Sequence, residues 1–172
     1  HYGLVFKILH WLIALLIICQ IFLGFFLHHL ENKASIQRGF FVHKSMGISL
    51  LFLAIIFILW RFINRKPSWP NTMPLWERFA ARCVHVLLYL SILIMPLSGW
   101  LMSAAAGYPP SFWGLFTLHS PFAVNAKLAS FFGDVHVTCA WIISALIIIH
   151  ILAALKHAFI DRDDVLQKML HR

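Results

Sequence analysis

Eleven histidines occur in a chain of 172 residues that is 61% hydrophobic and only 12% charged. An ionisable side chain at membrane depth is costly and usually marks a functional site. His136 and His150 are the most informative pair, because fourteen residues of α-helix turn through about 40° less than four full turns and rise by about 21 Å. One helix would therefore present both imidazoles on one face at two depths. Neutral imidazole is a common ligand of metals and of haem iron.

The remaining sequence indicates which elements must position these histidines. Apolar blocks cover roughly residues 6–27, 41–63, 79–102 and 135–159, and about 20 apolar residues let a helix cross a hydrocarbon core of roughly 30 Å. We therefore expect an all-α integral membrane protein, a four-helix transmembrane bundle that forms a single domain over residues 1–172. The first block is too long for a signal peptide and lacks a small-residue cleavage site, so we expect it in the mature protein.

The net charge of +8 indicates topology and not a nucleic-acid partner. Most Lys and Arg residues flank the apolar blocks instead of forming a stripe on a soluble face. Ten of the 14 are Lys7, five residues in the connection 61–82 and four in the C-terminal tail. The positive-inside rule then places both termini and this connection in the cytoplasm. The aromatic connection 103–134 lies outside, and the basic residues predicted on that side are Lys33, Arg38, Lys44 and Lys127.

This topology pairs the histidines by depth. His43 begins the second block on the outer side, level with His136. His10 lies near the inner start of the first block, at a depth comparable with that of His150. We therefore predict two iron sites, an outer one with His43 and His136 and an inner one with His10 and His150. His85, at the inner end of the third block, is the main competitor of His10.

Each histidine also has a plain structural interpretation. A single histidine in a membrane helix is more often a polar contact between helices than a ligand. The set of four at paired depths favours ligation. His157 lies seven residues beyond His150 on nearly the same helix face, and three interpretations stay open for it: contact with a haem propionate, binding of a quinone, or solvation.

The cysteines and glycines add constraints. The three cysteines form no CxxC or CxxCH pair, so disulfides and covalent haem attachment are both unsupported. Gly24, Gly47 and Gly99 lie inside apolar blocks, where they either let helices approach closely or make room for a porphyrin.

Short stretches at these positions resemble the bacterial cytochrome b561 family of four-helix, di-haem membrane proteins. The resemblance covers nearly the whole chain. The stretches are Tyr2-Gly3 before Lys7-Ile8-Leu9-His10-Trp11, His43-Lys44-Ser45-Met46-Gly47, His85 followed by Tyr89, Pro96 and Gly99, and His136 with His150 and His157. In that family the haem ligands match His10, His43, His136 and His150, and the position that matches His157 is associated with quinone binding.

The resemblance implies an oxidoreductase with two haem b groups in the bacterial inner membrane. At least one family member resembles a superoxide oxidase, which passes electrons from superoxide through both haems to ubiquinone. A superoxide:ubiquinone oxidoreductase is therefore the first hypothesis. The alternative is an electron-transfer cytochrome b module that links the quinone pool to a partner dehydrogenase, hydrogenase or periplasmic redox protein. The short connections favour the first. A structural or transport bundle would leave the paired histidines unexplained.

Overall fold

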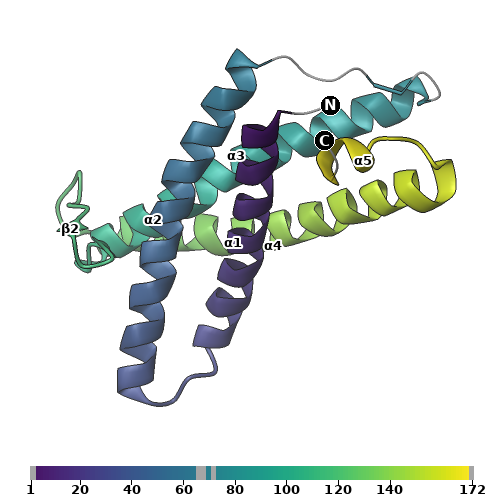
Figure 1. Ribbon diagram of the computed structural model, residues 1–172. Coiled ribbons are helices and arrows are strands. Elements are labelled where there is room, and N and C mark those ends of the chain that lie inside the picture. Colours follow the sequence, from purple (N-terminus) through teal and green to yellow (C-terminus); the bar gives the residue numbers. More distant parts are fainter. Residues whose placement is uncertain (1–2, 65–68, 71–72, 171–172) are drawn as a thin grey trace.

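Helices form almost all of the regular structure in a computed structural model that describes residues 3–64, 69–70 and 73–170. The elements are α1 (Leu4–Leu27), α2 (Lys33–Ile63), α3 (Leu75–Ala105), β1 (Ser111–Phe112), β2 (Phe116–Thr117), α4 (Ala126–Lys156), the π-helix η1 (His157–Asp161) and α5 (Gln167–Leu170). Helices α1 and α2 form one hairpin and α3 and α4 a second, and the two hairpins cross in the view of Figure 1.

Each of the four long helices is long and apolar enough to cross a membrane. Their outward side chains are large and apolar, as those of Phe22, Phe62 and Ile63 show with exposures of 71%, 83% and 80%. Contact of such side chains with water is unfavourable in free energy, whereas contact with lipid is not. The prediction of an all-α integral membrane protein with four transmembrane helices is therefore confirmed, and the protein is a multi-pass membrane protein.

Helices α2 and α4 begin earlier than their apolar blocks. Helix α2 begins at Lys33 instead of residue 41, and α4 begins at Ala126 instead of residue 135. An asparagine caps each start: the Asn32 side chain accepts hydrogen bonds from two backbone N–H groups, and the Asn125 side chain accepts one from Leu128. Such caps satisfy N–H groups that have no partner within the helix. The helices therefore extend beyond their apolar segments.

The apolar core lies where the two hairpins cross. All four long helices contribute buried residues to it, and these are Phe6, Ile13, Leu50, Ala54, Phe57, Ile92 and Ile143. The ring of Phe6 stacks on that of Phe57 with centroids 4.9 Å apart, which joins the start of α1 to the last turns of α2. This layer fixes how far apart the helices stand, and hence where their polar side chains meet.

The connection between α3 and α4 folds into a small β-hairpin, which the sequence analysis did not predict. Strands β1 and β2 pair antiparallel around a three-residue loop, and Trp113 and Gly114 in this loop have positive φ values of 49° and 77°. The fully buried hydroxyl of Ser45 on α2 donates to the carbonyl of Ser111 at 3.0 Å and accepts from the backbone N–H of Trp113 at 3.1 Å. The hairpin is therefore bound to α2 two residues after His43.

The C-terminal segment returns toward the start of α1 (Figure 1). Helix α4 continues as the π-helix η1, after which Arg162 adopts a left-handed conformation with φ 53° and reverses the chain. The indole N–H of Trp11 donates to the backbone carbonyl of Met169 at 3.3 Å. The start of α1 and the end of α4 are thus connected through α5.

Candidate functional site

The structure brings the depth-paired histidines into two clusters. The ring centroids of His10 and His150 lie 6.2 Å apart, and those of His43 and His136 lie 6.3 Å apart. Helix α4 provides one member of each pair, whereas the partners come from α1 and α2. The two clusters therefore lie at two levels along α4, as the spacing of fourteen residues predicts.

The spacing within each cluster fits a single metal ion between two imidazoles. An imidazole nitrogen binds a transition metal at about 2.0 Å, and the ring centre lies about 1.1 Å farther, so two imidazoles on opposite sides of one metal have centroids about 6.2 Å apart. The measured 6.2 Å and 6.3 Å agree with this value. Rings that only pack against each other have no fixed spacing, because the centroids of aromatic pairs lie anywhere between about 4.5 and 7 Å apart. Each pair could therefore hold one metal ion, such as a haem iron.

Unpaired nitrogen atoms support the same interpretation. The Nδ1 atoms of His10 and His43 are buried and have no hydrogen-bond partner within the described part of the chain. A buried polar atom without a partner costs about 1–3 kcal/mol. A ring nitrogen without a partner among the described residues is available to bind a metal ion. The donor chemistry of each pair, two neutral imidazoles in an apolar bundle, is that of b-type haem ligation.

His136 has the most completely ordered ring of the four histidines. Its Nδ1 lies 2.9 Å from the carbonyl of Met95 and 3.3 Å from the hydroxyl of Ser98, both on α3. The Nδ1–H therefore donates to this carbonyl, and Nε2 remains as the ligand atom. Such a hydrogen bond fixes the tautomer and the orientation of a metal-bound histidine.

Two glycines allow the His43 and His136 rings to take these positions. A Cβ atom on Gly99 of α3 would lie 2.9 Å from Cε1 of His136, and one on Gly24 of α1 would lie 3.2 Å from Cε1 of His43. Gly47 meets a different group, the side-chain nitrogen of Gln20 at 3.3 Å. Gly24 and Gly99 therefore make room for ligand imidazoles, a use that was not among those considered from the sequence.

His85 remains close to the His10–His150 pair. Its ring centroid lies 5.3 Å from that of His150, nearer than the ring of His10. This separation is about 1 Å too short for two imidazoles on opposite sides of one metal ion. The Nδ1 of His85 also lies 2.6 Å from the carbonyl of Ala81, one turn earlier on α3. The geometry thus favours His10 over His85 as the partner of His150.

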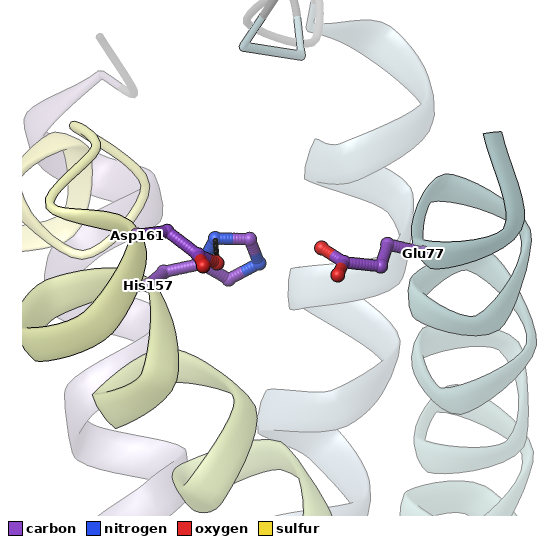
Figure 2. A group of neighbouring side chains, drawn as sticks. All are labelled: Glu77, His157 and Asp161. Carbon is purple, nitrogen blue, oxygen red and sulfur yellow. Dashed lines mark ion pairs between the residues drawn. The ribbon is translucent and has the colours of Figure 1, made fainter. Parts of the chain in front are cut away.

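His157 takes part in neither pair and meets carboxylates instead. Its Nδ1 lies 2.7 Å from Oδ2 of Asp163 and 3.2 Å from Oδ2 of Asp161. Figure 2 shows the Glu77 carboxylate on α3 facing the same ring. The sequence analysis did not identify these acidic residues as site residues, although three aspartates follow His157 within seven residues. This cluster of aspartates is the feature of the sequence that could have identified them.

Comparisons with known proteins bear on the whole chain. A sequence model of the prokaryotic cytochrome b561 family matches residues 1–172. The chain is 37% identical to "Cytochrome b561 homolog 2" of Escherichia coli (strain K12), over 98% of this chain and 90% of that protein. It is 32% identical to "Cytochrome b561 homolog 1" of the same organism, over 76% of this chain and 73% of that protein.

Proposed function

This chain belongs to the prokaryotic cytochrome b561 family of membrane haem proteins that transfer electrons, and from this premise we propose that it is a superoxide:ubiquinone oxidoreductase of the bacterial inner membrane. In this proposal, superoxide is oxidised on the outer side and ubiquinone is reduced on the inner side, and both termini are cytoplasmic. The observation that carries the proposal is the pair of histidine clusters at two levels of α4, each with the centroid spacing of a bis-imidazole metal site.

His43 and His136 would hold the iron of an outer haem b, and His10 and His150 would hold that of an inner haem b. Each haem, when bound, supplies an iron that gains and loses one electron. The chain holds the ligand rings rigidly: Gly24 and Gly99 admit them, and the carbonyl of Met95 orients one of them. The single domain over residues 1–172 remains part of this proposal.

An apolar layer separates the two proposed haem levels. Ile143 is seven residues from both His136 and His150 and is only 2% exposed. Leu50 and Ile92 pack in the same buried cluster. Side chains of this kind exclude water and offer no carrier for protons. In this proposal, electrons cross this apolar layer between the two levels.

The charge distribution supports an anionic donor on the outer side. Lys44 directly follows His43, and its ammonium group donates to the backbone carbonyl of Tyr108 at 3.4 Å. A positive group beside the outer site attracts a small anion such as superoxide and raises its encounter rate. The overall reaction balances when two superoxide ions give two electrons to one ubiquinone, which takes up two protons on the inner side and becomes ubiquinol.

Stopped-flow absorbance of the oxidised, detergent-purified protein tests this proposal. We expect superoxide to reduce the haem at a rate near the diffusion limit, and a soluble ubiquinone analogue to support continuous turnover. Superoxide dismutase added before mixing is the control and must abolish the reduction. Haem that is present but is not reduced by superoxide would contradict the superoxide half of the proposal. The protein would then be an electron-transfer module for a dehydrogenase, a hydrogenase or a periplasmic redox protein.

A further inference from the structure

The connection between α3 and α4 carries no charged side chain. No Asp, Glu, Lys or Arg occurs between Arg82 and Lys127, although charged residues make up 12% of the chain. A connection that stands in water normally contains charged residues, because their side chains are stable in water and are mostly exposed. The composition of this connection is instead similar to that of the membrane-spanning helices.

The β-hairpin in this connection lies beside α2 and not beyond its end (Figure 1). The indole N–H of Trp113 donates to the hydroxyl of Ser49 at 3.1 Å, and the ring centroid of Phe112 lies 5.9 Å from that of Phe52. Both α2 residues belong to the uncharged stretch 45–60. They lie about 6 Å and about 11 Å from the start of this stretch along the helix axis, because each residue of an α-helix rises about 1.5 Å. The hairpin is therefore level with the part of α2 that enters the membrane.

The aromatic rings of the hairpin continue the lipid-facing surface of α2. The ring of Phe112 contacts that of Phe52 on one side and that of Phe116, with centroids 5.1 Å apart, on the other. Phe52 and Phe116 are 45% and 49% exposed, and Leu115 at the tip of the hairpin is 77% exposed. A contiguous exposed apolar surface usually contacts a membrane or another protein. Because this surface is continuous with that of a transmembrane helix, lipid is the neighbour that it fits.

The backbone of the hairpin makes the hydrogen bonds that contact with lipid requires. A polar backbone group without a partner is costly in lipid, because no water is present to bind it. The N–H of Leu115 donates to the carbonyl of Phe112 at 2.9 Å, and the N–H of Leu118 donates to that of Pro110 at 2.9 Å. The indole N–H of Trp100 donates to the carbonyl of Leu118 at 3.3 Å, and the serine hydroxyl on α2 described above satisfies two further groups. The hairpin can therefore lie against lipid with these groups paired.

We propose that the β-hairpin of residues 110–118 is a membrane anchor, which lies at the lipid–water interface with the side chains of Leu115 and Phe116 among the acyl chains of phospholipids. Trp113 and Tyr108 fit this position, since Trp and Tyr are enriched at membrane interfaces. The position of the hairpin depends on its contacts with α2 and on no cofactor. The anchor is therefore independent of the superoxide and quinone steps proposed above.

Spin-label accessibility of the holoprotein in vesicles of phosphatidylethanolamine and phosphatidylglycerol tests this position. The native cysteines Cys19, Cys83 and Cys139 are first replaced by alanine, and single cysteines are then introduced and labelled with a nitroxide. Oxygen dissolves preferentially among acyl chains, whereas a polar nickel chelate stays in water, because polar solutes are costly to transfer into hydrocarbon. The ratio of the two collision rates thus reports whether a label lies in lipid or in water.

Two exposed positions on α2 provide the references for water and for lipid. Gln37→Cys lies in the part of α2 that precedes the apolar block, and Ile56→Cys lies within the uncharged stretch. At Leu115→Cys and Phe116→Cys we expect oxygen to be the better quencher, as at Ile56, and access of the nickel chelate to be about tenfold lower than at Gln37. Thr117→Cys is the matched control within the hairpin, because successive side chains of a strand point to opposite faces. The chelate should reach a label there more readily than one at Phe116.

Two results would overturn the proposal. Equal access of the chelate to labels at Leu115, Phe116 and Gln37 would place the hairpin in water, and its apolar surface would then be a docking site for a partner protein. Protection of Phe116 and Thr117 from both oxygen and the chelate would mean that protein covers the hairpin, for example a second copy of this chain. The haem-to-protein ratio verifies the fold of each labelled variant, and the labels at Leu115 and Phe116 give two separate readings. No turnover is measured, so a failure of the proposed function leaves this result unaffected.

Discussion

Substituting Gly99 by alanine tests whether the ring of His136 is held in place for ligation. The new Cβ would lie 2.9 Å from Cε1 and 3.1 Å from Nδ1 of this ring, whereas ordinary contacts begin at 3.4 Å. The ring cannot turn aside without cost, because its Nδ1–H donates to the carbonyl of Met95 at 2.9 Å. The ring or α3 must therefore move by about half an ångström.

A displacement of this size should disturb metal binding by the ring much more than the folding of the protein. A functional metal–ligand distance tolerates about 0.2 Å, so we expect the outer haem to be lost or to bind weakly. Overpacking in a well-packed interior costs about 1–3 kcal/mol, and alanine recovers about 1 kcal/mol of helix propensity relative to glycine. The variant should therefore fold and insert, with its defect confined to one haem site.

The assay is the haem-to-protein ratio of purified variants, combined with a redox titration that resolves the two haems. Two further glycine substitutions serve as comparisons for Gly99→Ala. Gly24→Ala places its Cβ 3.2 Å from His43 and should weaken the same site less, while Gly133→Ala meets the flexible side chain of Met102 at 3.3 Å and should bind haem like the wild type. Full haem content with unchanged potentials in Gly99→Ala would refute this reasoning.

Three more substitutions probe other parts of the structure. Ser45→Ala leaves two partly buried backbone groups of the β-hairpin, the Ser111 carbonyl and the Trp113 N–H, without their partner. We expect thermal unfolding in detergent to show a loss of about 1 kcal/mol; an unchanged Tm would contradict this. Lys156→Met leaves the carboxylates of Glu77 and Asp161, each 2.7 Å from this ammonium group, without their shared cation, so Tm should fall at low salt and the difference should shrink at high salt, because salt screens exposed charges. His85→Ala should retain both haems, measured as the haem-to-protein ratio, since its ring is too close to that of His150; a loss of one haem would make His85 the ligand.

The sequence predicted those features that depend on one helix at a time. The fold class follows from apolar blocks, and the alignment of His136 with His150 follows from helical periodicity. The charge bias then gave a relative depth to each block, and with it the pairing of His10 and His43 with partners on α4. The structure brings these pairs together at ring distances of 6.2 Å and 6.3 Å. Their role as haem ligands remains a prediction.

The features that were not predicted depend on contacts between elements. No periodicity indicates that Gly99 lies against the ring of His136, because that contact depends on the register of α3 on α4. The helix starts at Lys33 and Ala126 were placed too late, because hydropathy marks the lipid boundary and the capping asparagines mark the helix boundary. The β-hairpin was missed because only two residues on each strand pair, and its stability comes from Ser45 on a distant helix.

The contact between Asp163 and His157 shows why neighbouring residues differ in how readily a sequence reveals them. His157 lies on the face of α4 that His136 and His150 define, so the periodicity of one helix is sufficient to identify it. Asp163 lies six residues beyond His157, where a continued α-helix would carry it about 120° away from that face. Only the π-helical turn and the left-handed Arg162 bring its carboxylate to 2.7 Å from the ring. Substituting Asp163 therefore tests a contact that the backbone irregularity creates, whereas substituting His157 tests one that helical geometry already implies.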